Sequence, residues 1–420
     1  MTNQEPAHGP FLRRLFDRAV EVADPMQSLA AYLPQKPEGR LVVIGAGKAS
    51  ARMAEAVEAV YGPCEGLVIT RYGYARPCAG IEIVEAAHPV PDEAGMVATR
   101  RMLDLVEGLG ENDMVLALIS GGASALLVQP AGDITLAQKQ EVNQALLASG
   151  APIGKMNVVR KHLSRAKGGQ LAAAAHPARM LALMISDVPG DDPAMIGSGP
   201  TVGDASTQDD VRDILERHGI DVPASVRDVL RGDRRVVLPN DARLSTVENV
   251  IYAAPSQSLE AAAEMARAEG FDARILGDAL EGEARDVALV HAQTAMAVQA
   301  SLASDAVPVL LLSGGELTVT RRGDGVGGPN AEYALALAIA LNGAEGICAI
   351  ACDTDGVDGA AEVAGAVIGP DTLVGGESAQ TALERNDAHG FFERNGGQVV
   401  TGPTLTNVND FRAILIEPRG

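Results

Sequence analysis

The turn around Lys48 has the residue types of a phosphate-binding loop. An apolar run, 41–44, leads into Gly-Ala-Gly, and Lys48 follows directly, ahead of residues that suit a helix. Glycines at such a turn let backbone N–H groups approach an anion, and a helix N-terminus favours negative charge. We therefore expect Lys48 to contact a phosphate, the alternative being a solvated lysine in a tight turn.

The same turn fails two nucleotide-binding motifs. Val42 stands where a Walker A loop needs its first glycine. Ser50 replaces the third glycine of the dinucleotide fingerprint, and the next strand ends in Thr70-Arg71 instead of an acid. The turn therefore favours a phosphate contact over a bound dinucleotide.

A second small-residue loop, Ser120-Gly-Gly-Ala-Ser124, also follows an apolar run. Two hydroxyls and consecutive small residues suit phosphate oxygens. Ser124 as a hydrolase nucleophile is the alternative, but the loop lacks the Gly-x-Ser-x-Gly elbow and no histidine neighbour is evident. We predict a second phosphate contact here.

Three carboxylates follow the apolar run 181–185, namely Asp187, Asp191 and Asp192. Carboxylates at a strand end can hold Mg²⁺ on substrate phosphates or accept a proton from a hydroxyl nucleophile. The alternative is that they cap turns, which explains one of them better than all three. The loop that contains them, 186–207, is long enough to be functional.

Another acidic turn, Asp353-Thr-Asp355-Gly-Val-Asp358-Gly359, begins like a calcium-binding loop. The match fails because Ala364 falls where the last ligand is due. We expect one or two of these acids near a metal or ATP. The lone histidines His88 and His162 are expected in core or capping roles.

Strands and helices alternate along the chain, which predicts an α/β fold with a mostly parallel sheet. A helix is expected over 11–23, and a long helix over 155–175 with an interruption at Gly168-Gly169 as an alternative. The charged run 231–243 is the expected boundary, so that residues 1–240 form a Rossmann-like domain and 241–420 a second α/β domain. The strand at 250–253 is expected to open the second domain.

Composition limits the functional classes. The 420 residues carry a net charge of −21 with no visible basic cluster, which argues against a nucleic-acid surface. No apolar stretch approaches the length of a membrane span, and the N-terminus has no signal character, so we expect a cytoplasmic protein. The four cysteines lack Cys-x-x-Cys spacing and are expected to be free thiols.

Ordered motifs along almost the whole chain carry a family resemblance. They are Ile44-Gly-Ala-Gly-Lys48, His88-Pro-Val-Pro-Asp92, Leu118-Ile-Ser-Gly-Gly122 with Ser124-Ala-Leu-Leu127, Val159-Arg-Lys-His-Leu-Ser164 with Lys167-Gly-Gly169, Ser186–Asp192 with Ser198-Gly-Pro-Thr201, Ser313-Gly-Gly-Glu316, Gly327-Gly328 with Asn330 and Glu332, Thr354-Asp-Gly356 with Asp358-Gly359, and Gly402-Pro-Thr404 with Thr406-Asn-Val-Asn-Asp410. Together they resemble the class II glycerate kinases, the D-glycerate 2-kinase family, many members of which are labelled hydroxypyruvate reductase.

The resemblance implies a Rossmann-like N-terminal domain, a smaller C-terminal α/β domain and an active-site cleft between them. It implies transfer of a phosphoryl group from ATP, with Mg²⁺, to the 2-hydroxyl of D-glycerate. Combined with the loops above, it assigns catalysis to Lys48, Asp187 and Asp191; the metal to Asp187, Asp191 and Asp192; ATP to Gly45, Gly47, Ser120, Gly121, Gly122, Ser124, Ser313, Gly314, Gly315, Glu316 and Asp355; and substrate to Arg160, Lys161, Ser198, Asn330 and Asn407.

The sequence departs from the family pattern at four positions. Pro329 stands where many members carry arginine, so Arg160 or Lys161 becomes the candidate for the substrate carboxylate. Ala123, Leu317 and Leu405 stand where glycine, threonine and glycine are common.

Two other functions stay open at this point. One is an NAD(P)H-dependent hydroxypyruvate reductase, which the damaged dinucleotide fingerprint disfavours. The other is a catalytically silent sugar-acid binding protein on the same scaffold, which the departures permit. We expect no nucleic-acid or membrane partner, and the sequence leaves a homodimer open.

Overall fold

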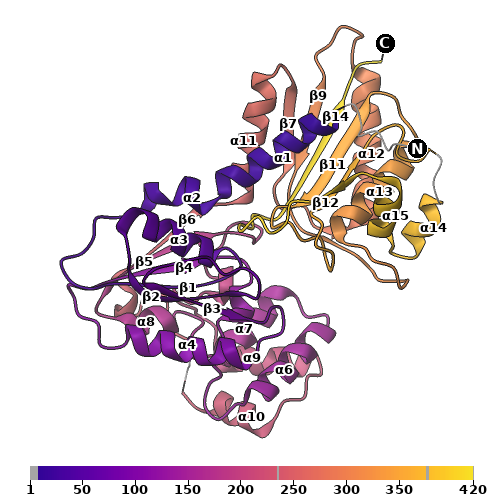
Figure 1. The fold of residues 1–420 in the computed structure, drawn as a ribbon. Helices are drawn as coiled ribbons and strands as arrows, with labels where there is room; N and C mark the ends of the chain where they lie inside the picture. The colour runs from indigo at the N-terminus through magenta and orange to yellow at the C-terminus, as the bar shows by residue number, and fades with distance from the viewer. Residues whose placement is uncertain (1–7, 234–235, 375–377, 420) are drawn as a thin grey trace. The chain divides into compact units, whose positions relative to one another are not determined.

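The computed structural model describes residues 8–233, 236–374 and 378–419, and its contacts divide the chain into two compact units (Figure 1). The first unit contains residues 25–252, and the second contains residues 253–419 together with 8–24. Each unit has its own six-stranded sheet covered by helices, which confirms the predicted α/β class.

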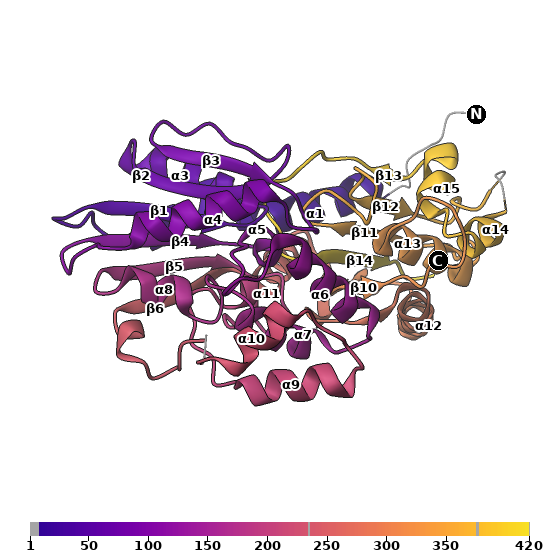
Figure 2. The same cartoon turned by 90° about the horizontal axis from the view of Figure 1, so that it is seen from below.

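The sheet of the first unit has the strand order β3-β2-β1-β4-β5-β6 (Figure 2). Strands β1 to β5 pair in parallel. Every residue of β4 is buried, as expected for a parallel strand covered on both faces. The strand order reverses between β1 and β4, the place where open α/β sheets bind ligands. The strands are β1 (Leu41–Ala46), β2 (Glu65–Arg71), β3 (Ile81–Ala86), β4 (Met114–Ile119), β5 (Arg179–Ile185) and β6 (Val247–Ala253).

Helix α3 covers one face of this sheet, and α4 and α8 cover the other (Figure 1). The start of α4 is fixed by Asp92, whose side chain accepts a hydrogen bond from the N–H of Gly95 at 3.0 Å. The central helices are α3 (Ser50–Tyr61), α4 (Glu93–Val106), α5 (Ala123–Leu126) and α8 (Gln170–Ala175), preceded by α2 (Pro25–Ser28) and the short 3₁₀ helix Leu29–Tyr32.

Four helices of the first unit form a group with a hydrophobic core of its own. Val159, Leu163, Val211 and Ile214 belong to this core. Thr135 and Gln138 form a capping box that starts the first of these helices. The helices are α6 (Leu136–Ala148), α7 (Ile153–His162), α9 (Gln208–Arg217) and α10 (Ala224–Arg231); two 3₁₀ turns, Ile196–Ser198 and Ala242–Leu244, complete the unit.

The sheet of the second unit has the order β13-β12-β11-β14-β9-β7. Strand β14 runs antiparallel to both of its neighbours, so its first residues meet the last residues of β9 and β11 at one edge. The strands are β7 (Asp272–Gly277), β9 (Val309–Ser313), β11 (Ile347–Asp353), β12 (Gly365–Ile368), β13 (Gln398–Val399) and β14 (Asp410–Ile416), and a small parallel pair joins β8 (Gly282–Glu283) to β10 (Leu317–Thr318).

Alternate residues of β9 enter two separate cores, as the two-residue period of a strand requires. Val309 and Leu311 pack with α12 and α13, whereas Leu310 and Leu312 pack with α1 and α11. The helices are α1 (Gly9–Ala23), α11 (Pro255–Ala268), α12 (Ala284–Ser301), α13 (Pro329–Leu341), α14 (Ala379–Glu384) and α15 (Ala388–Asn395).

The structure differs from the predicted organisation in three places. Helix α1 packs in the second unit, where Leu12 and Phe16 contact its core, although it comes first in the sequence. Strand β6, expected to open the second domain, is the edge strand of the first sheet, so the division falls after residue 252 and not at 240. The helix expected over 155–175 is divided, as the alternative with an interruption at Gly168-Gly169 predicted, but the gap is longer, since α7 ends at His162 and α8 begins at Gln170.

The break between α7 and α8 has a conformational cause. Gly168 and Gly169 both have positive φ angles, +57° and +79°, which a helix cannot continue through.

No helix among the described residues combines the length and the apolar character that crossing a membrane requires.

Candidate functional site

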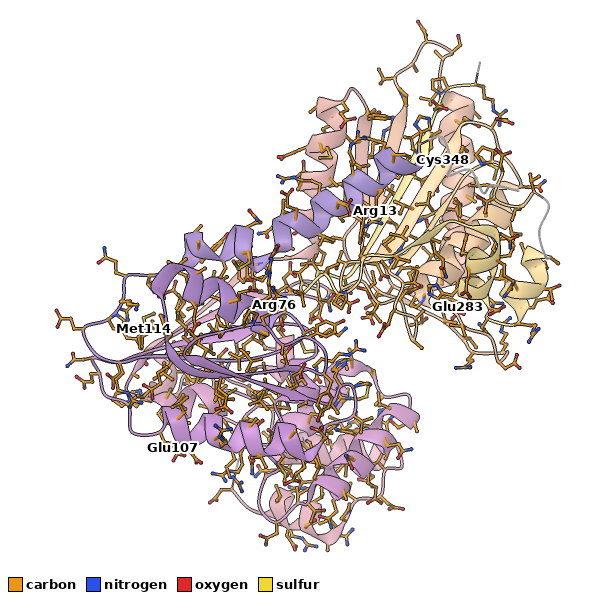
Figure 3. All side chains as sticks on the ribbon, in the orientation of Figure 1. Arg13, Arg76, Glu107, Met114, Glu283 and Cys348 are labelled. Carbon is orange, nitrogen blue, oxygen red and sulfur yellow. The ribbon has the colours of Figure 1, made fainter. Side chains whose placement is uncertain are left out.

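The loops after β1, β4 and β5 leave one edge of the first sheet next to each other. The strand registers pair Ala46 with Ile119, and Ile119 with Met184. Met114, labelled in Figure 3, marks the amino end of β4, so these loops start at the opposite, carboxyl edge. Gly45 lies within β1, opposite Leu118. The fold thus brings together three segments that the sequence predicted to carry chemistry.

Gly47 packs directly against Ser120. A Cβ added to Gly47 would lie 2.1 Å from the Oγ of Ser120, so a side chain there would force the loops apart. The buried hydroxyl of Ser120 accepts the N–H of Ala49 at 3.0 Å and lies 3.2 Å from the hydroxyl of Ser50. The N–H of Lys48 donates to the carbonyl of Gly121 at 2.8 Å. Ser120 therefore joins the two loops.

Gly122 brings Lys48 and His88 to the same place. Its φ is +84°, and an added Cβ would lie 3.1 Å from the imidazole of His88 and 3.3 Å from Cγ of Lys48. Within the described ranges, the amide N–H groups of Gly121 and Gly122 make no hydrogen bond. Two backbone donors and a lysine side chain are therefore gathered where an anion could bind.

The three aspartates after β5 do not form a closed metal cage. Asp192 accepts the N–H of Ala194 at 2.9 Å and caps a turn. Asp191 has a φ of +52°, and its Oδ1 is buried without a hydrogen-bond partner among the described residues. Asp187 is partly buried near the end of β5.

No group of three or more His, Cys, Asp or Glu side chains is arranged to hold a metal, as far as the described ranges extend. Mg²⁺ needs only one or two carboxylates when phosphate oxygens and water supply its other ligands. The orphaned, buried Oδ1 of Asp191 is an oxygen of the kind that such an ion binds, so this loop fits one carboxylate contact to Mg²⁺.

A polar chain links the β4 loop to the long loop after β5. The hydroxyls of Ser124 and Ser198 are 2.7 Å apart. The Oδ1 of Asn157 accepts both the Ser198 hydroxyl and an Nη1–H of Arg160, each at 3.3 Å. Ser198 has a φ of +64°, a conformation that is costly for a residue with a side chain and that clusters at functional sites. The structure thus unites Ser124, Ser198 and Arg160, which the sequence predicted separately.

Two buried lysines lie behind Arg160. Lys139 is 3% exposed and Lys167 is 2% exposed. Burial, followed by repulsion from Arg160, lowers the pKa of Lys139 to about 7. Burial lowers the pKa of Lys167 well below its ordinary value, with repulsion from Lys139 and Arg160 adding to the effect. Burial also lowers the pKa of Arg160.

Lys161 takes a different place from its neighbour Arg160. Its Nζ donates to Asp204 at 2.7 Å, and both side chains are largely buried. Burial acts to raise the pKa of Asp204, but hydrogen bonds from Lys161 and Ser206 outweigh it and lower the pKa. His162 contacts Ser206 at 3.1 Å. Lys161 is therefore held in an ion pair, which leaves Arg160 as the cation beside the serines.

In the second unit, Arg412 fixes the loop Ser313–Glu316 after β9. Its Nη1 and Nη2 donate to the carbonyls of Gly314 and Gly315 at 3.1 and 2.7 Å. A Cβ at Gly315 would lie 2.1 Å from the backbone N of Leu280, so this position also requires glycine. The buried guanidinium pairs with Asp410 at 3.0 Å.

The predicted ligands Asn330, Asp355 and Asn407 are hydrogen-bonded within the second unit. Asn330 donates from its side chain to Asp410 at 2.7 Å and from its backbone to Asp358 at 2.9 Å. The side chains of Asp355 and Asn407 accept backbone N–H groups of nearby residues in their own turns. These three side chains shape the loops at the end of the second sheet.

The departures from the family pattern have local explanations. Pro329 is the first residue of α13, where a missing N–H costs no hydrogen bond. Leu405 has a φ of +63°, which explains why glycine is common there. Ala123 begins α5 and Leu317 is buried in β10.

The sequence did not single out Lys139 or Asn157, and it gave His88 a structural role. Neither Lys139 nor Asn157 belongs to a loop with a recognisable binding pattern, because both lie inside helices. Lysine is scarce in this chain, with six among 420 residues, and that scarcity was the available signal for Lys139.

Two family models match this chain. Residues 11–231 match a domain of unknown function, DUF4147, and residues 309–410 match the MOFRL family. A protein of Agrobacterium vitis that is provisionally named a hydroxypyruvate reductase is 51% identical, over 99% of this chain and 96% of its own length.

Kinases are also similar over nearly the full length. The D-glycerate 2-kinase of Thermotoga maritima is 38% identical over 95% of this chain and 96% of its own. A crystal structure of glycerate kinase from Thermotoga maritima aligns with a TM-score of 0.87 at 37% identity and covers 96% of this chain and 98% of its own.

Replacing Gly47 tests the contact between the two loops. We expect Gly47→Ala to lower the free energy of unfolding by about 1–3 kcal/mol, because its Cβ overpacks against Ser120. Gly154→Ala is the control, since a Cβ there meets nothing within 4 Å. Urea unfolding measures both, and equal stability of the two variants would contradict the close contact.

Replacing Arg412 tests the loop support in the second unit. Arg412→Met should cost about 3–5 kcal/mol, because it leaves the carboxylate of Asp410 buried and unpaired. Arg274→Met removes an exposed ion pair with Asp272 and should change stability by at most about 1 kcal/mol. A similar shift of the urea midpoint in both variants would rule out the assigned role.

Proposed function

This chain belongs to the class II glycerate kinase family, and we propose that it transfers the γ-phosphoryl group of ATP to the 2-hydroxyl of D-glycerate, giving 2-phosphoglycerate and ADP. The observation that carries the proposal is the group formed by Lys48 and the amides of Gly121 and Gly122 at the switch point of the first sheet. Phosphoryl transfer requires positioning and charge neutralisation more than covalent help from the protein, and this group supplies both.

In this proposal, the donors at the switch point hold phosphate oxygens. Lys48 neutralises charge that spreads over the transferred group, and the N–H groups of Gly121 and Gly122 donate hydrogen bonds to its oxygens. The tight contact between Gly47 and Ser120 keeps these donors in place before substrate arrives, so that little reorganisation is needed.

Mg²⁺, when bound, would neutralise phosphate charge and orient the transferred group. Asp191 would contact it through the Oδ1 that is otherwise unpaired. Asp187 would then be the carboxylate that orients the glycerate 2-hydroxyl or accepts its proton. Asp192 caps a turn, and in this proposal its role is structural.

The loop Ser313–Glu316 and the turn of Asp355 remain our candidates for further nucleotide contacts. Arg412 supports the proposal for the first of these, because it holds two carbonyls of the loop and so fixes the direction of the intervening peptides. A homodimer and a cytoplasmic location also remain proposals.

A reductase is the second candidate, favoured by the provisional name of the Agrobacterium vitis protein. The first sheet has the strand order of dinucleotide-binding domains. The details disfavour it, since the buried Ser50 occupies the third-glycine position and Thr70, at the end of β2, donates to the carbonyl of Gly47.

One assay separates the two candidates. The purified protein is mixed with ATP, Mg²⁺ and D-glycerate and followed by ³¹P NMR, while NADH and hydroxypyruvate are combined in a parallel cuvette. A 2-phosphoglycerate signal without NADH loss is the expected result. NADH oxidation without phosphoryl transfer would overturn the proposal.

Lys48→Ala should lower kcat/KM by about 10²–10³, the effect of losing one preorganised charge contact in a transition state. The free energy of unfolding should change little, because the partly buried lysine covers little apolar surface. Lys36→Ala, at an exposed position, is the control. Near-normal turnover in Lys48→Ala would remove this residue from the mechanism.

Asp191→Asn should abolish most activity and keep the fold, because asparagine tolerates the positive φ at this position. If Asp191 binds metal, the Mg²⁺ concentration for half-maximal rate should rise about tenfold or more, and high Mg²⁺ should restore rate. Asp104→Asn, at an exposed site on α4, is the control. A rate loss that Mg²⁺ does not relieve would assign Asp191 to proton transfer instead, and unchanged kinetics would remove it from the site.

A further inference from the structure

Three cations meet in the first unit without an acidic partner. Burial lowers the pKa of both Lys139 and Lys167, and repulsion within the group of Lys139, Arg160 and Lys167 adds to the effect. No ion pair joins any of the three to a carboxylate within the described ranges. Asp204 is paired with Lys161, the chain neighbour of Arg160.

The two lysines use little of their hydrogen-bonding capacity. Lys139 donates to the carbonyl of Arg160 at 3.3 Å, and Lys167 donates to the carbonyl of Leu127 at 2.8 Å. A lysine ammonium has three N–H donors, and each of these side chains makes a single hydrogen bond in the described structure. The remaining donors have no partner among the residues that the structure describes.

Such an arrangement is costly for the fold. A buried ammonium without a counter-charge loses its hydration and gains no ion pair in exchange. Proteins almost never bury an unpaired lysine. Burying two of them beside an arginine adds mutual repulsion. An anion that enters the cluster would offset this cost, and titratable groups with strongly shifted pKa values cluster at functional sites.

The open end of the cluster is polar and partly accessible. Arg160 and Ser124 are partly buried, whereas Ser198 and Asn157 behind them are buried. Asn157 holds Arg160 and Ser198 together through one amide oxygen. A guanidinium oriented in this way presents its other N–H groups to a planar oxyanion.

We propose that Lys139, Arg160 and Lys167 form a binding site for the carboxylate of the hydroxy acid substrate, with Arg160 as the direct contact and the two lysines behind it. The proposal rests on the proposed kinase function and deepens it. It assigns to this cluster the part of substrate recognition that precedes phosphoryl transfer.

The charge of the cluster favours a carboxylate over a phosphate. Burial lowers the pKa of both lysines, so the free site carries less positive charge than three full cations would. A reduced positive charge of this kind suits a monoanion. A phosphate ester carries about −1.5 to −2 and would be matched less well.

The position of the cluster fits the chemistry of a 2-hydroxy acid. In such an acid the carboxylate is attached to the carbon that bears the reactive hydroxyl. The loop Ser120–Ser124 serves both groups, because Gly121 and Gly122 belong to the proposed phosphate site and Ser124 contacts Ser198 beside Arg160. A carboxylate at Arg160 would thus hold the 2-hydroxyl close to the phosphate donors.

Two variants separate binding from structure. Arg160→Met should raise the KM for D-glycerate about 30-fold or more, as expected for a lost charged hydrogen bond, and leave the KM for ATP within about twofold. Lys139→Met should raise the melting temperature of the free protein and abolish most of the further rise that D-glycerate produces. Lys155, which is exposed on the same helix as Arg160, provides the control. Lys155→Met should change neither the KM for D-glycerate nor the melting temperature.

Probes without ATP identify the ligand chemistry. Thermal shift should show protection of the wild-type protein by D-glycerate and glycolate, weaker protection by inorganic phosphate and none by glycerol, which lacks the carboxylate. Protection by phosphate that exceeds that of glycolate and is lost in Arg160→Met would overturn the carboxylate assignment. A lower melting temperature in Lys139→Met with unchanged D-glycerate affinity would show a structural lysine and overturn its role.

The outcomes distinguish this proposal from the kinase function. If wild-type protein makes 2-phosphoglycerate and Arg160→Met keeps its KM for D-glycerate, the carboxylate site is wrong and the kinase function stands. If D-glycerate protects the wild type, Arg160→Met loses that protection and no 2-phosphoglycerate forms, the site stands and the kinase function is wrong.

Discussion

The first unit depends on the approach of two loops at backbone distance. Gly47 lies against Ser120 so closely that a Cβ cannot fit, and the Ser120 hydroxyl is buried where β1 and β4 end. The strand order of the sheet reverses between β1 and β4, and the loop after β4 leaves Gly122 partly exposed at this point, with Gly121 buried beside it. The donors proposed for phosphate are consequences of this contact.

The loop Ser120–Ser124 also leads to the buried cations, through the contact of Ser124 with Ser198. These cations lower the stability of the fold. Hydration of Lys139 and Lys167 is lost and no carboxylate of the described residues replaces it, so the free protein is less stable than it would be with apolar residues there. Proteins retain such costs where binding needs them, and strain follows the same rule: Ser198 and Asp191 both have positive φ angles next to the proposed sites.

The second unit uses a buried arginine for an analogous purpose. Arg412 is 1% exposed, pairs with Asp410 and reaches the carbonyls of Gly314 and Gly315. Burial raises the pKa of Asp410. Attraction to Arg412 and a hydrogen bond from Asn330 lower this pKa, but by less than burial raises it. The loop after β9 thus has a rigid support that no motif of the sequence describes.

Local patterns in the sequence determined most of the elements and the glycine loops, because apolar periodicity and glycine at strand ends act over a few residues. They placed β1, β4 and the glycine turn between β1 and α3 correctly in the chain. They could not assign α1 to the second unit or β6 to the first sheet, since both depend on which apolar face each element finds after the chain has folded. Only the tertiary structure gathered Lys139, Arg160 and Lys167, because the energy of a buried charge depends on its neighbours in space and not on its neighbours in sequence.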